Sequence, residues 1–335
     1  GSSASTASTG WNTTEIHNGQ PVASTKNPNS SKQGKSKKIK PKSEKELIAF
    51  YKQDRRFISV ANHTKHASHN DNQDQPPQQE AECQQLRVRV MSYNILADGA
   101  SYALGQFHNY CPKDYRHWGY RFKSILCQLK AYSPDIVCIQ ETTPSSWKQK
   151  MQGPLQKIGY VGIHAPREVL EAKFAGKAQS DCIVWKEKKF TLIKHKVLRL
   201  GAFLKYDKNS KKTNEYDERY DKLLGSPKSM YRSFCKSCSD VVIVLHLHCN
   251  VTRKEFIVCS SHFFWDPKNP EVKATQALVF NMELQRLLTT DPEWKWNRNS
   301  DDDDETKSDE VDINEIPIIF GVDSNSLPWK DKTDE

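Results

Sequence analysis

Residues 135–141 read DIVCIQE, a short apolar run closed by an amide and a carboxylate. Ser133 and Pro134 end the helical pattern before this run, so residues 135–140 are predicted to form a short buried strand. Gln140 and Glu141 then lie where that strand emerges from the core. An oxygen ligand at such a point is what a sheet-based enzyme needs to hold a divalent cation.

Two more motifs of this kind follow apolar runs elsewhere in the chain. Ser92-Tyr93-Asn94 comes directly after residues 86–91, and Asp323-Ser324-Asn325 comes shortly after residues 316–320. Strand ends can bring together side chains that are far apart in the sequence. We therefore expect these motifs to gather around one divalent cation and one phosphate.

The rest of residues 86–335 changes irregularly between helical and extended patterns. Apolar side chains recur at helical spacing in residues 118–132 and 272–288. Strands are predicted from alternation or short apolar runs over residues 86–95, 182–185, 190–193, 241–248, 256–260 and 316–320. Helices and strands mixed in this way predict a layered α/β domain.

Residues 1–85 have a different composition and are predicted to be a largely disordered basic and polar arm before the folded domain, residues 86–335. One short amphipathic helix is expected over residues 46–59. Five lysines between residues 35 and 42 fit a nuclear-import or RNA-contacting patch, but we favour the interpretation that they belong to a solvated, disordered arm. The charged stretches 206–222 and 300–310 are predicted to be surface inserts.

Bulk composition narrows the classes of partner. The chain has 335 residues, a net charge of +9 and 36% apolar residues. The positive charge favours an anionic partner, which could be nucleic acid, an anionic membrane surface or an acidic protein. The chain has no run of about 18 apolar residues, so no membrane span is expected. Cys138, Cys182 and Cys259 lie in apolar runs and indicate a reducing compartment. We expect an intracellular protein, cytoplasmic rather than nuclear.

The motif residues suit the hydrolysis of a phosphodiester, which needs a hard cation, an activated water and donors to the phosphate. Mg²⁺ keeps several waters, so the Glu141 carboxylate and the Asn94 amide oxygen would suffice as direct or water-mediated ligands. Asp323 can accept a proton from the attacking water. Asn325, two residues on, would orient that water. His262 follows another apolar run and can donate to a phosphate oxygen.

The same residues resemble a known family. Residues 91–97 (MSYNILA) look like the opening motif of the endonuclease/exonuclease/phosphatase superfamily, in the branch of the carbon-catabolite-repression deadenylases, nocturnin, the angel proteins and the 2′-phosphodiesterases. The resemblance covers about residues 86–330. Its further motifs, in the same order, are YCP at 110–112, WGYR at 118–121, DIVCIQE at 135–141, SH at 261–262, WDP at 265–267, VK at 272–273, and GVDSNSLP at 321–328 with one residue inserted.

The resemblance implies a four-layer α/β sandwich, with two packed mixed sheets flanked by helices. It implies a 3′→5′ exoribonuclease that uses Mg²⁺, with Mn²⁺ as an alternative, and trims single-stranded poly(A) to 5′-AMP. Glu141 would be the principal metal ligand, and Asn94 would neighbour the metal and the phosphate. His262 would bind the scissile phosphate, while Asp323 and Asn325 would orient the nucleophile and stabilise the transition state.

The chain departs from the family pattern after Pro328, where the family has a further strand and a Ser-Asp-His motif. We therefore expect a C-terminally truncated segment with its last strands missing. General-base catalysis contributes about 10²–10⁴-fold, so this segment alone is expected to turn over poorly. Asp181 falls where the family has a Gly-Cys pair, and it is interpreted as a structural residue.

Other features leave alternatives open. Phe264 and Trp265 beside His262 are candidates for stacking on RNA bases, or else core aromatics. A zinc site built from two cysteines and two histidines is a further alternative. However, histidines within an apolar strand lack the geometry of a zinc knuckle, and the resemblance gives no zinc at these positions. Hydrolysis of 2′-5′ oligoadenylate or another nucleotide by the same metal centre, and a non-catalytic RNA-binding or scaffold role, are the alternative functions. The four zinc candidates are Cys235, Cys238, His246 and His248.

Overall fold

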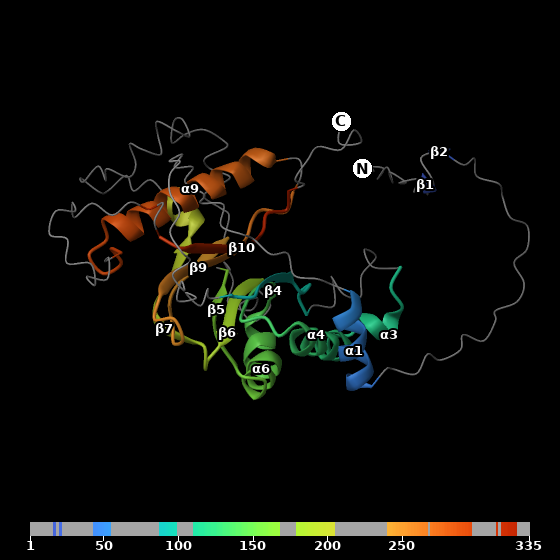
Figure 1. Cartoon of the computed structure of the whole chain (residues 1–335). Helices are drawn as coiled ribbons and strands as arrows, with labels where there is room; N and C mark the ends of the chain where they lie inside the picture. The colour runs from blue at the N-terminus through green and yellow to red at the C-terminus, as the bar shows by residue number, and fades with distance from the viewer. Residues whose placement is uncertain are drawn as a thin grey trace, which may run out of the picture. The chain divides into compact units, whose positions relative to one another are not determined.

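The computed structural model describes residues 16–17, 20–21, 43–54, 87–98, 110–167, 179–204, 240–266, 269–296, 313 and 316–326 (Figure 1). The chain divides into two units, residues 1–41 and 42–335. In the first unit, the described residues form two short antiparallel strands, β1 (Ile16–His17) and β2 (Gln20–Pro21). The charged inserts and the Cys235–Cys238 pair lie outside the described residues, and the predicted domain boundary at residues 85–86 stays a prediction.

The first four-stranded sheet has the order β3-β4-β6-β5. Its strands are β3 (Val90–Asn94), β4 (Ile136–Thr142), β6 (Ser180–Lys186) and β5 (Tyr160–Pro166). β3 and β4 are parallel, and the other pairs are antiparallel. Asn94 pairs with Gln140, so the ends of β3 and β4 reach the same edge of the sheet.

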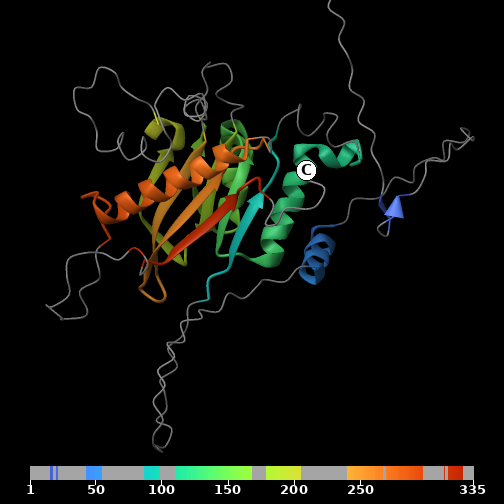
Figure 2. The same ribbon diagram turned by 90° about the horizontal axis from the view of Figure 1, so that it is seen from above.

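The second sheet repeats this pattern in the order β10-β9-β8-β7. Its strands are β10 (Ile318–Asp323), β9 (Glu255–His262), β8 (Val241–Cys249) and β7 (Phe190–Arg199). β10 and β9 are parallel, and Asp323 pairs with His262. Each sheet therefore delivers the ends of two parallel strands to one edge. β10 contacts β3, and the two strands run side by side in Figure 2.

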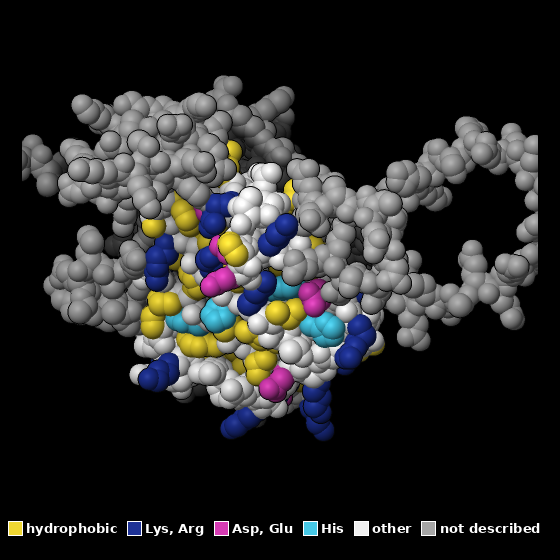
Figure 3. All heavy atoms as spheres, turned by 90° about the vertical axis from the view of Figure 1, so that its left-hand side faces the viewer, with side chains coloured by type: hydrophobic (Ala, Val, Ile, Leu, Met, Phe, Trp, Pro, Cys, Tyr) yellow, Lys and Arg dark blue, Asp and Glu magenta, His cyan; other side chains and the backbone are white. Residues whose placement is uncertain are grey.

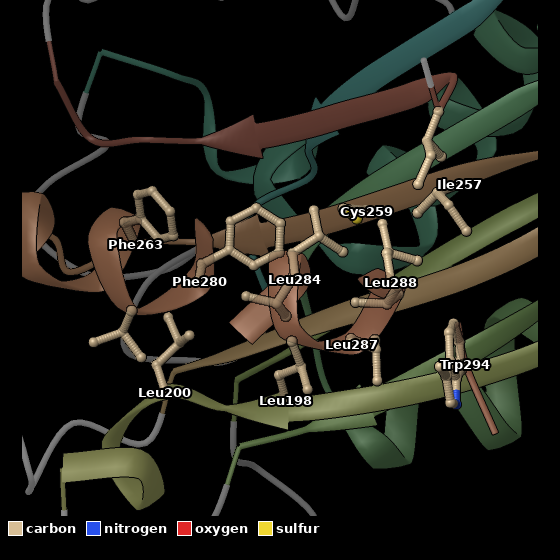
Figure 4. Packing of buried hydrophobic residues seen from close by; sticks show 14 of the residues in the cluster. Leu198, Leu200, Ile257, Cys259, Phe263, Phe280, Leu284, Leu287, Leu288 and Trp294 are labelled. Atoms are coloured by element: carbon tan, nitrogen blue, oxygen red, sulfur yellow. The ribbon is translucent and has the colours of Figure 1, made fainter. Parts of the chain in front are cut away.

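Helices cover the outer face of each sheet. α4 (Trp118–Tyr132), a π-helical turn (Trp147–Met151) and α6 (Gln152–Lys157) pack on the first sheet through Phe122, Met151 and other apolar side chains. α9 (Pro270–Thr289) packs on the second sheet, where Leu284, Leu287 and Leu288 meet Leu198, Ile257 and Cys259 (Figure 4). The remaining helices are α1 (Glu44–Asp54), α3 (Lys113–Arg116), α5 (Pro144–Ser146) and the 3₁₀-helix Leu200–Leu204.

A third apolar cluster fills the space between the sheets. Ile136, Ile183 and Trp185 of the first sheet pack there against Ile243, Leu245 and Val258 of the second. Helices, sheet, sheet and helix thus stack in four layers, which confirms the predicted α/β sandwich. Among the described residues, no helix combines the length and hydropathy that a bilayer crossing requires.

Most predicted elements are present. The helix predicted over residues 118–132 has the same bounds in α4. The helix expected over residues 46–59 is α1, which begins at Glu44 and packs on α4 through the rings of Tyr51 and Tyr132. β7 continues to Arg199, six residues beyond its predicted end at residue 193. β5 was not predicted, because its partly buried residues, interrupted by Gly162, form neither an apolar run nor a clean alternation.

Candidate active site

Four predicted residues meet where the parallel strands of both sheets end. Asn94 ends β3, Glu141 lies near the end of β4, His262 ends β9 and Asp323 ends β10. The Asn94 Nδ2 atom donates to Glu141 Oε1 at 2.9 Å and to Asp323 Oδ2 at 2.8 Å. Asn94 and Asp323 are 229 positions apart in the chain. One amide therefore joins a carboxylate of each sheet.

A β-bulge turns Glu141 into this position. The pairing of β4 with β6 shifts register between Ile139 and Thr142, and Glu141 has a φ of +59°. A left-handed backbone is uncommon for residues other than glycine and often marks a functional position. The Glu141 Oε2 atom also accepts a hydrogen bond from the Ala97 backbone at 3.2 Å. Both carboxylate oxygens are thus oriented by groups that follow or end β3.

The loop after β3 is held by Arg121 of α4. Its Nη1 atom donates to the carbonyls of Ile95 at 2.9 Å and Leu96 at 2.6 Å. Leu96 itself has a φ of +55°, and its backbone nitrogen donates to Asn94 Oδ1 at 2.9 Å. The planar guanidinium can serve several carbonyls at once. Arg121 therefore supports the site by holding the backbone of this loop, rather than by a hydrogen bond to the carboxylates of the site.

Asn325 links the ends of β9 and β10. Its Nδ2 atom donates to the Phe263 carbonyl at 2.9 Å and lies 2.7 Å from His262 Nε2. An amide nitrogen only donates, so Nε2 accepts and the His262 proton lies on Nδ1. Nδ1 is buried, with no hydrogen-bond partner among the described residues. To donate to a phosphate from Nε2, His262 must shift its proton and Asn325 must release it.

Burial and one nearby cation favour this neutral ring. Burial lowers the pKa of His262, and the nearby charge of Arg167 lowers it further. The carboxylates of Asp323 and Glu141 act in the opposite direction. The Asp323 Oδ2 atom lies 3.8 Å from His262 Nε2, while Asp323 Oδ1 accepts from the Asn325 backbone at 3.0 Å. The site is therefore a network in which each polar side chain touches at least one other.

The donor set fits a hard divalent cation that keeps most of its water. The described residues contain no cluster of three or more His, Cys, Asp or Glu side chains placed to hold a metal. Two converging carboxylates, Glu141 and Asp323, match the few protein ligands that Mg²⁺ takes. Asn94 presents its nitrogen to both carboxylates, so to act as an oxygen ligand it would have to turn over and break its bond with Leu96.

The aromatic candidates follow directly after β9. The Trp265 side chain is 68% exposed, and its ring centroid lies 6.2 Å from that of the partly buried Phe264. Phe263 belongs to the core beneath α9. An RNA-stacking role for Phe264 and Trp265 stays a prediction. On the face drawn in Figure 3, the basic side chains of the described residues are scattered among acidic and apolar ones and do not form one patch.

Three charged residues near the site were not predicted to contribute to it. Arg167 follows β5, Asp181 lies in β6 and Asp240 precedes β8. Burial raises the pKa of Asp181 to about 7; the Arg167 charge opposes this rise, and Asp240 adds to it. In the sequence, each of these residues is only a charged side chain beside or within a buried strand. That pattern does not reveal which other side chains lie next to the charge in the folded protein.

Comparisons with known proteins agree with this fold and these motifs. The chain is 26% identical over 211 residues to the CCR4-Not complex 3′-5′-exoribonuclease subunit Ccr4 of Aspergillus oryzae, covering 62% of this chain and 26% of that protein. It is 27% identical over 202 residues to the subunit of the same name from Yarrowia lipolytica, covering 59% and 26%. The chain thus spans about a quarter of the length of these relatives.

A solved structure shares the fold. The crystal structure of ANGEL2, described as a 2′,3′-cyclic phosphatase, matches with a TM-score of 0.50 and 19% identity, covering 72% of this chain and 53% of that one. No protein-family profile matches the chain. The sequence matches to Ccr4 proteins confirm the resemblance to the endonuclease/exonuclease/phosphatase superfamily that the motifs carry, and ANGEL2 shares the fold.

Proposed function

We propose that this protein is a metal-dependent hydrolase of phosphodiester bonds and that its substrate is single-stranded RNA. The observation that carries the proposal is the pair of hydrogen bonds from Asn94 to Glu141 and Asp323. These bonds bring carboxylates of two sheets to one point, with His262 and Asn325 beside them. Two carboxylates held together in this way can bind a divalent cation, and such a cation stabilises the negative charge that develops on a phosphate.

Glu141 and Asp323 would hold a divalent cation, Mg²⁺ by preference, which would neutralise charge on the non-bridging phosphate oxygens. Asp323 accepts the proton of the attacking water, and Asn325 orients that water. The water oxygen bonds to phosphorus while the bond to the 3′ oxygen of the preceding nucleotide breaks. The leaving 3′ oxygen takes a proton from solvent water, so the products are a shortened strand with a 3′-hydroxyl and a nucleoside 5′-monophosphate. His262 donates to the phosphate once its ring carries a proton on Nε2.

The proposed substrate is poly(A), degraded from its 3′ end to 5′-AMP. The names of the relatives, exoribonuclease subunits of the CCR4-Not complex, support RNA as the class of substrate. The net charge of +9 favours an anionic partner, and the exposed ring of Trp265 offers a surface on which a base can stack. An intracellular and mainly cytoplasmic location fits this role.

Metal binding tests the site independently of turnover. In a titration followed by electron paramagnetic resonance, the signal of free Mn²⁺ measures the affinity of the chain for that ion. Glu141→Ala is expected to weaken binding at least tenfold. Glu255→Gln is the matched control, because Glu255 lies at the opposite end of β9 and bonds His246. Unchanged Mn²⁺ affinity in Glu141→Ala would contradict the proposed site.

The substrate is tested with the full-length gene product, 5′-labelled poly(A) and a 2′-5′ oligoadenylate, with Mg²⁺ and with EDTA. We expect a ladder of shortened poly(A) with Mg²⁺ only, and none with Glu141→Ala. If only the 2′-5′ oligoadenylate is cleaved, this oligonucleotide and not poly(A) is the substrate. The proposed metal site would still stand. Cleavage that survives both EDTA and Glu141→Ala would refute the mechanism.

A further inference from the structure

The helix α9 carries two buried polar side chains that the proposed chemistry does not use. Lys273 is 8% exposed and Gln276 is 2% exposed. The two residues are about one helical turn apart, so their side chains lie on the same face of α9. Lysine is rarely buried to this extent unless a partner holds its ammonium group. The contacts of both side chains lead to the loops that follow β9 and β10.

The Lys273 ammonium holds the backbone after β10. Its Nζ atom donates to the carbonyl oxygen of Asn325 at 2.7 Å. Among the described residues no carboxylate pairs with Lys273, so this carbonyl is the group that the ammonium serves. Asn325 has a φ of +50°, a left-handed conformation that asparagine adopts more readily than most residues but still at a cost. A bond from a charged donor to this carbonyl favours the left-handed turn.

This turn decides where the side chain of Asn325 points. The Asn325 Nδ2 atom lies 2.7 Å from His262 Nε2 and donates to the Phe263 carbonyl at 2.9 Å. The backbone nitrogen of Asn325 donates to Asp323 Oδ1 at 3.0 Å. One residue therefore joins His262, Asp323 and the backbone after β9. A change in the φ of Asn325 would break these contacts together.

Gln276 holds the loop after β9 by a separate route. Its Oε1 atom accepts from the Phe264 backbone at 2.8 Å, and its Nε2 atom donates to Asp240 Oδ2. Asp240 also pairs with Arg167 at 2.9 Å, and Arg167 Nη2 donates to the backbone carbonyl of His262 at 2.8 Å. The backbone of residues 262–264 is thus held without Lys273. Loss of Lys273 is therefore expected to release Asn325 and to leave the backbone of His262 in place.

We propose that Lys273 is a positioning residue of the active site. Through the backbone carbonyl of Asn325 it holds that residue in its left-handed turn, with the side-chain amide placed on His262. The proposal rests on the proposed function, since it takes Asn325 as the residue that orients the attacking water. Lys273 acts through Asn325 and is neither a metal ligand nor a proton donor.

The contact between Asn325 and His262 can be observed without metal or substrate. Nitrogen NMR at pH 8, where the imidazole ring is neutral, reports which ring nitrogen carries the proton. In the wild type we expect the proton of His262 on Nδ1, with Nε2 as the acceptor. Lys273→Met removes the donor and keeps a side chain of similar length. We expect it to shift His262 toward the form protonated on Nε2, because Asn325 no longer occupies that atom. The wild-type form retained in Lys273→Met would refute the proposal.

A rescue variant and a matched control separate positioning from general loosening of α9. Lys273→Arg is expected to keep the wild-type form of His262, since a guanidinium can still donate to the Asn325 carbonyl. Thr275→Val is the control, because Thr275 is 4% exposed and its hydroxyl donates to the Glu271 carbonyl within α9 itself. We expect no change at His262 in this control. A shift as large as that of Lys273→Met, in either Thr275→Val or Lys273→Arg, would overturn the proposal.

Nucleotide binding shows whether the site uses this position. The probe is 5′-AMP, titrated calorimetrically in the presence of Mn²⁺. Lys273→Met is expected to weaken 5′-AMP binding about tenfold, the effect of one lost hydrogen bond to a charged group. The Mn²⁺ affinity, measured by electron paramagnetic resonance, should stay within about threefold, because Asn94 still joins Glu141 to Asp323.

The two measurements separate this proposal from the proposed function. Unchanged 5′-AMP affinity in Lys273→Met would refute a role of Lys273 in the site, even if the proton of His262 moves. If the wild type binds neither Mn²⁺ nor 5′-AMP while the proton of His262 still moves in Lys273→Met, the proposed function fails. The link from Lys273 through Asn325 to His262 would then still stand.

Discussion

Gly321→Ala should damage the candidate site more than it damages the fold. Gly321 lies in β10, and a Cβ atom there would sit 2.6 Å from both Cβ and Sγ of Cys138 in the opposite sheet. Ordinary contact begins at 3.4 Å, so the two strands must separate by the difference, 0.8 Å. Among the described strands, β10 pairs only with β9 in its sheet, so we expect β10 to be the strand that yields.

That movement reaches Asp323, two residues further along β10. The bond from Asn94 Nδ2 to Asp323 Oδ2 is 2.8 Å long, and a shift of the same size away from the first sheet would stretch it to about 3.6 Å, beyond hydrogen-bond range. Overpacking costs about 1–3 kcal/mol of stability. A lost hydrogen bond to a charged group costs about 1.5–3 kcal/mol, which predicts a loss of Mn²⁺ affinity of roughly tenfold to a hundredfold.

Urea unfolding followed by tryptophan fluorescence measures the first effect, and the resonance signal of free Mn²⁺ measures the second. Gly162→Ala is the matched control. Its Cβ would lie 2.6 Å from the Ile183 carbonyl oxygen and a Val184 methyl group, but β5 is the outer strand farthest from β3 in its sheet. We expect Gly162→Ala to lose stability and keep its Mn²⁺ affinity. Wild-type affinity in Gly321→Ala, or an equal loss in Gly162→Ala, would refute the reasoning.

Three further predictions concern other parts of the domain. Burial lowers the pKa of His164 from 6.5 to about 4, so the unfolded chain binds a proton on this ring at a higher pH than the folded chain does. The free energy of unfolding should therefore fall by as much as about 3 kcal/mol as the pH drops from 6.5 toward 4. Urea unfolding at pH 7 and pH 4.5 should show a smaller loss of stability in His164→Gln than in the wild type. Arg121→Lys should lose about 1–3 kcal/mol of stability and weaken Mn²⁺ binding, since an ammonium cannot serve the carbonyls of Ile95 and Leu96 with the same fork; unfolding and resonance titrations check this. His117→Ser should raise the unfolding free energy by about 1 kcal/mol, because His117 caps α4 without a side-chain hydrogen bond; an unchanged urea midpoint would contradict it.

Local patterns in the sequence were sufficient for most of the fold. The helix of residues 118–132 could be placed because its apolar stripe and its stop signal at Ser133 and Pro134 depend only on near neighbours. β8 and β9 are largely continuous apolar runs, and such runs are predicted to be buried. The strand ends of β3, β4 and β10 could be singled out as candidate site positions because amides and carboxylates there interrupt such runs, and the structure brings their side chains together. These signals involve residues within a few positions of one another, which is the range over which periodicity carries information.

Contacts between distant segments decided the rest. β5 is extended because it pairs with β6. Its own residues show no strand pattern, so the sequence alone did not predict it. The bulge that turns Glu141 arises from the register of β4 against β6, and a single strand cannot reveal a register. Likewise, only the packing of the two sheets brings Arg167, which follows β5, into an ion pair with Asp240 and onto the backbone carbonyl of His262. The composition and short motifs of this chain determine which layers form and which side chains are candidates for the chemistry. The geometry that joins Asn94 to Asp323 across 229 positions exists only once the two sheets have packed, because no local interaction encodes it.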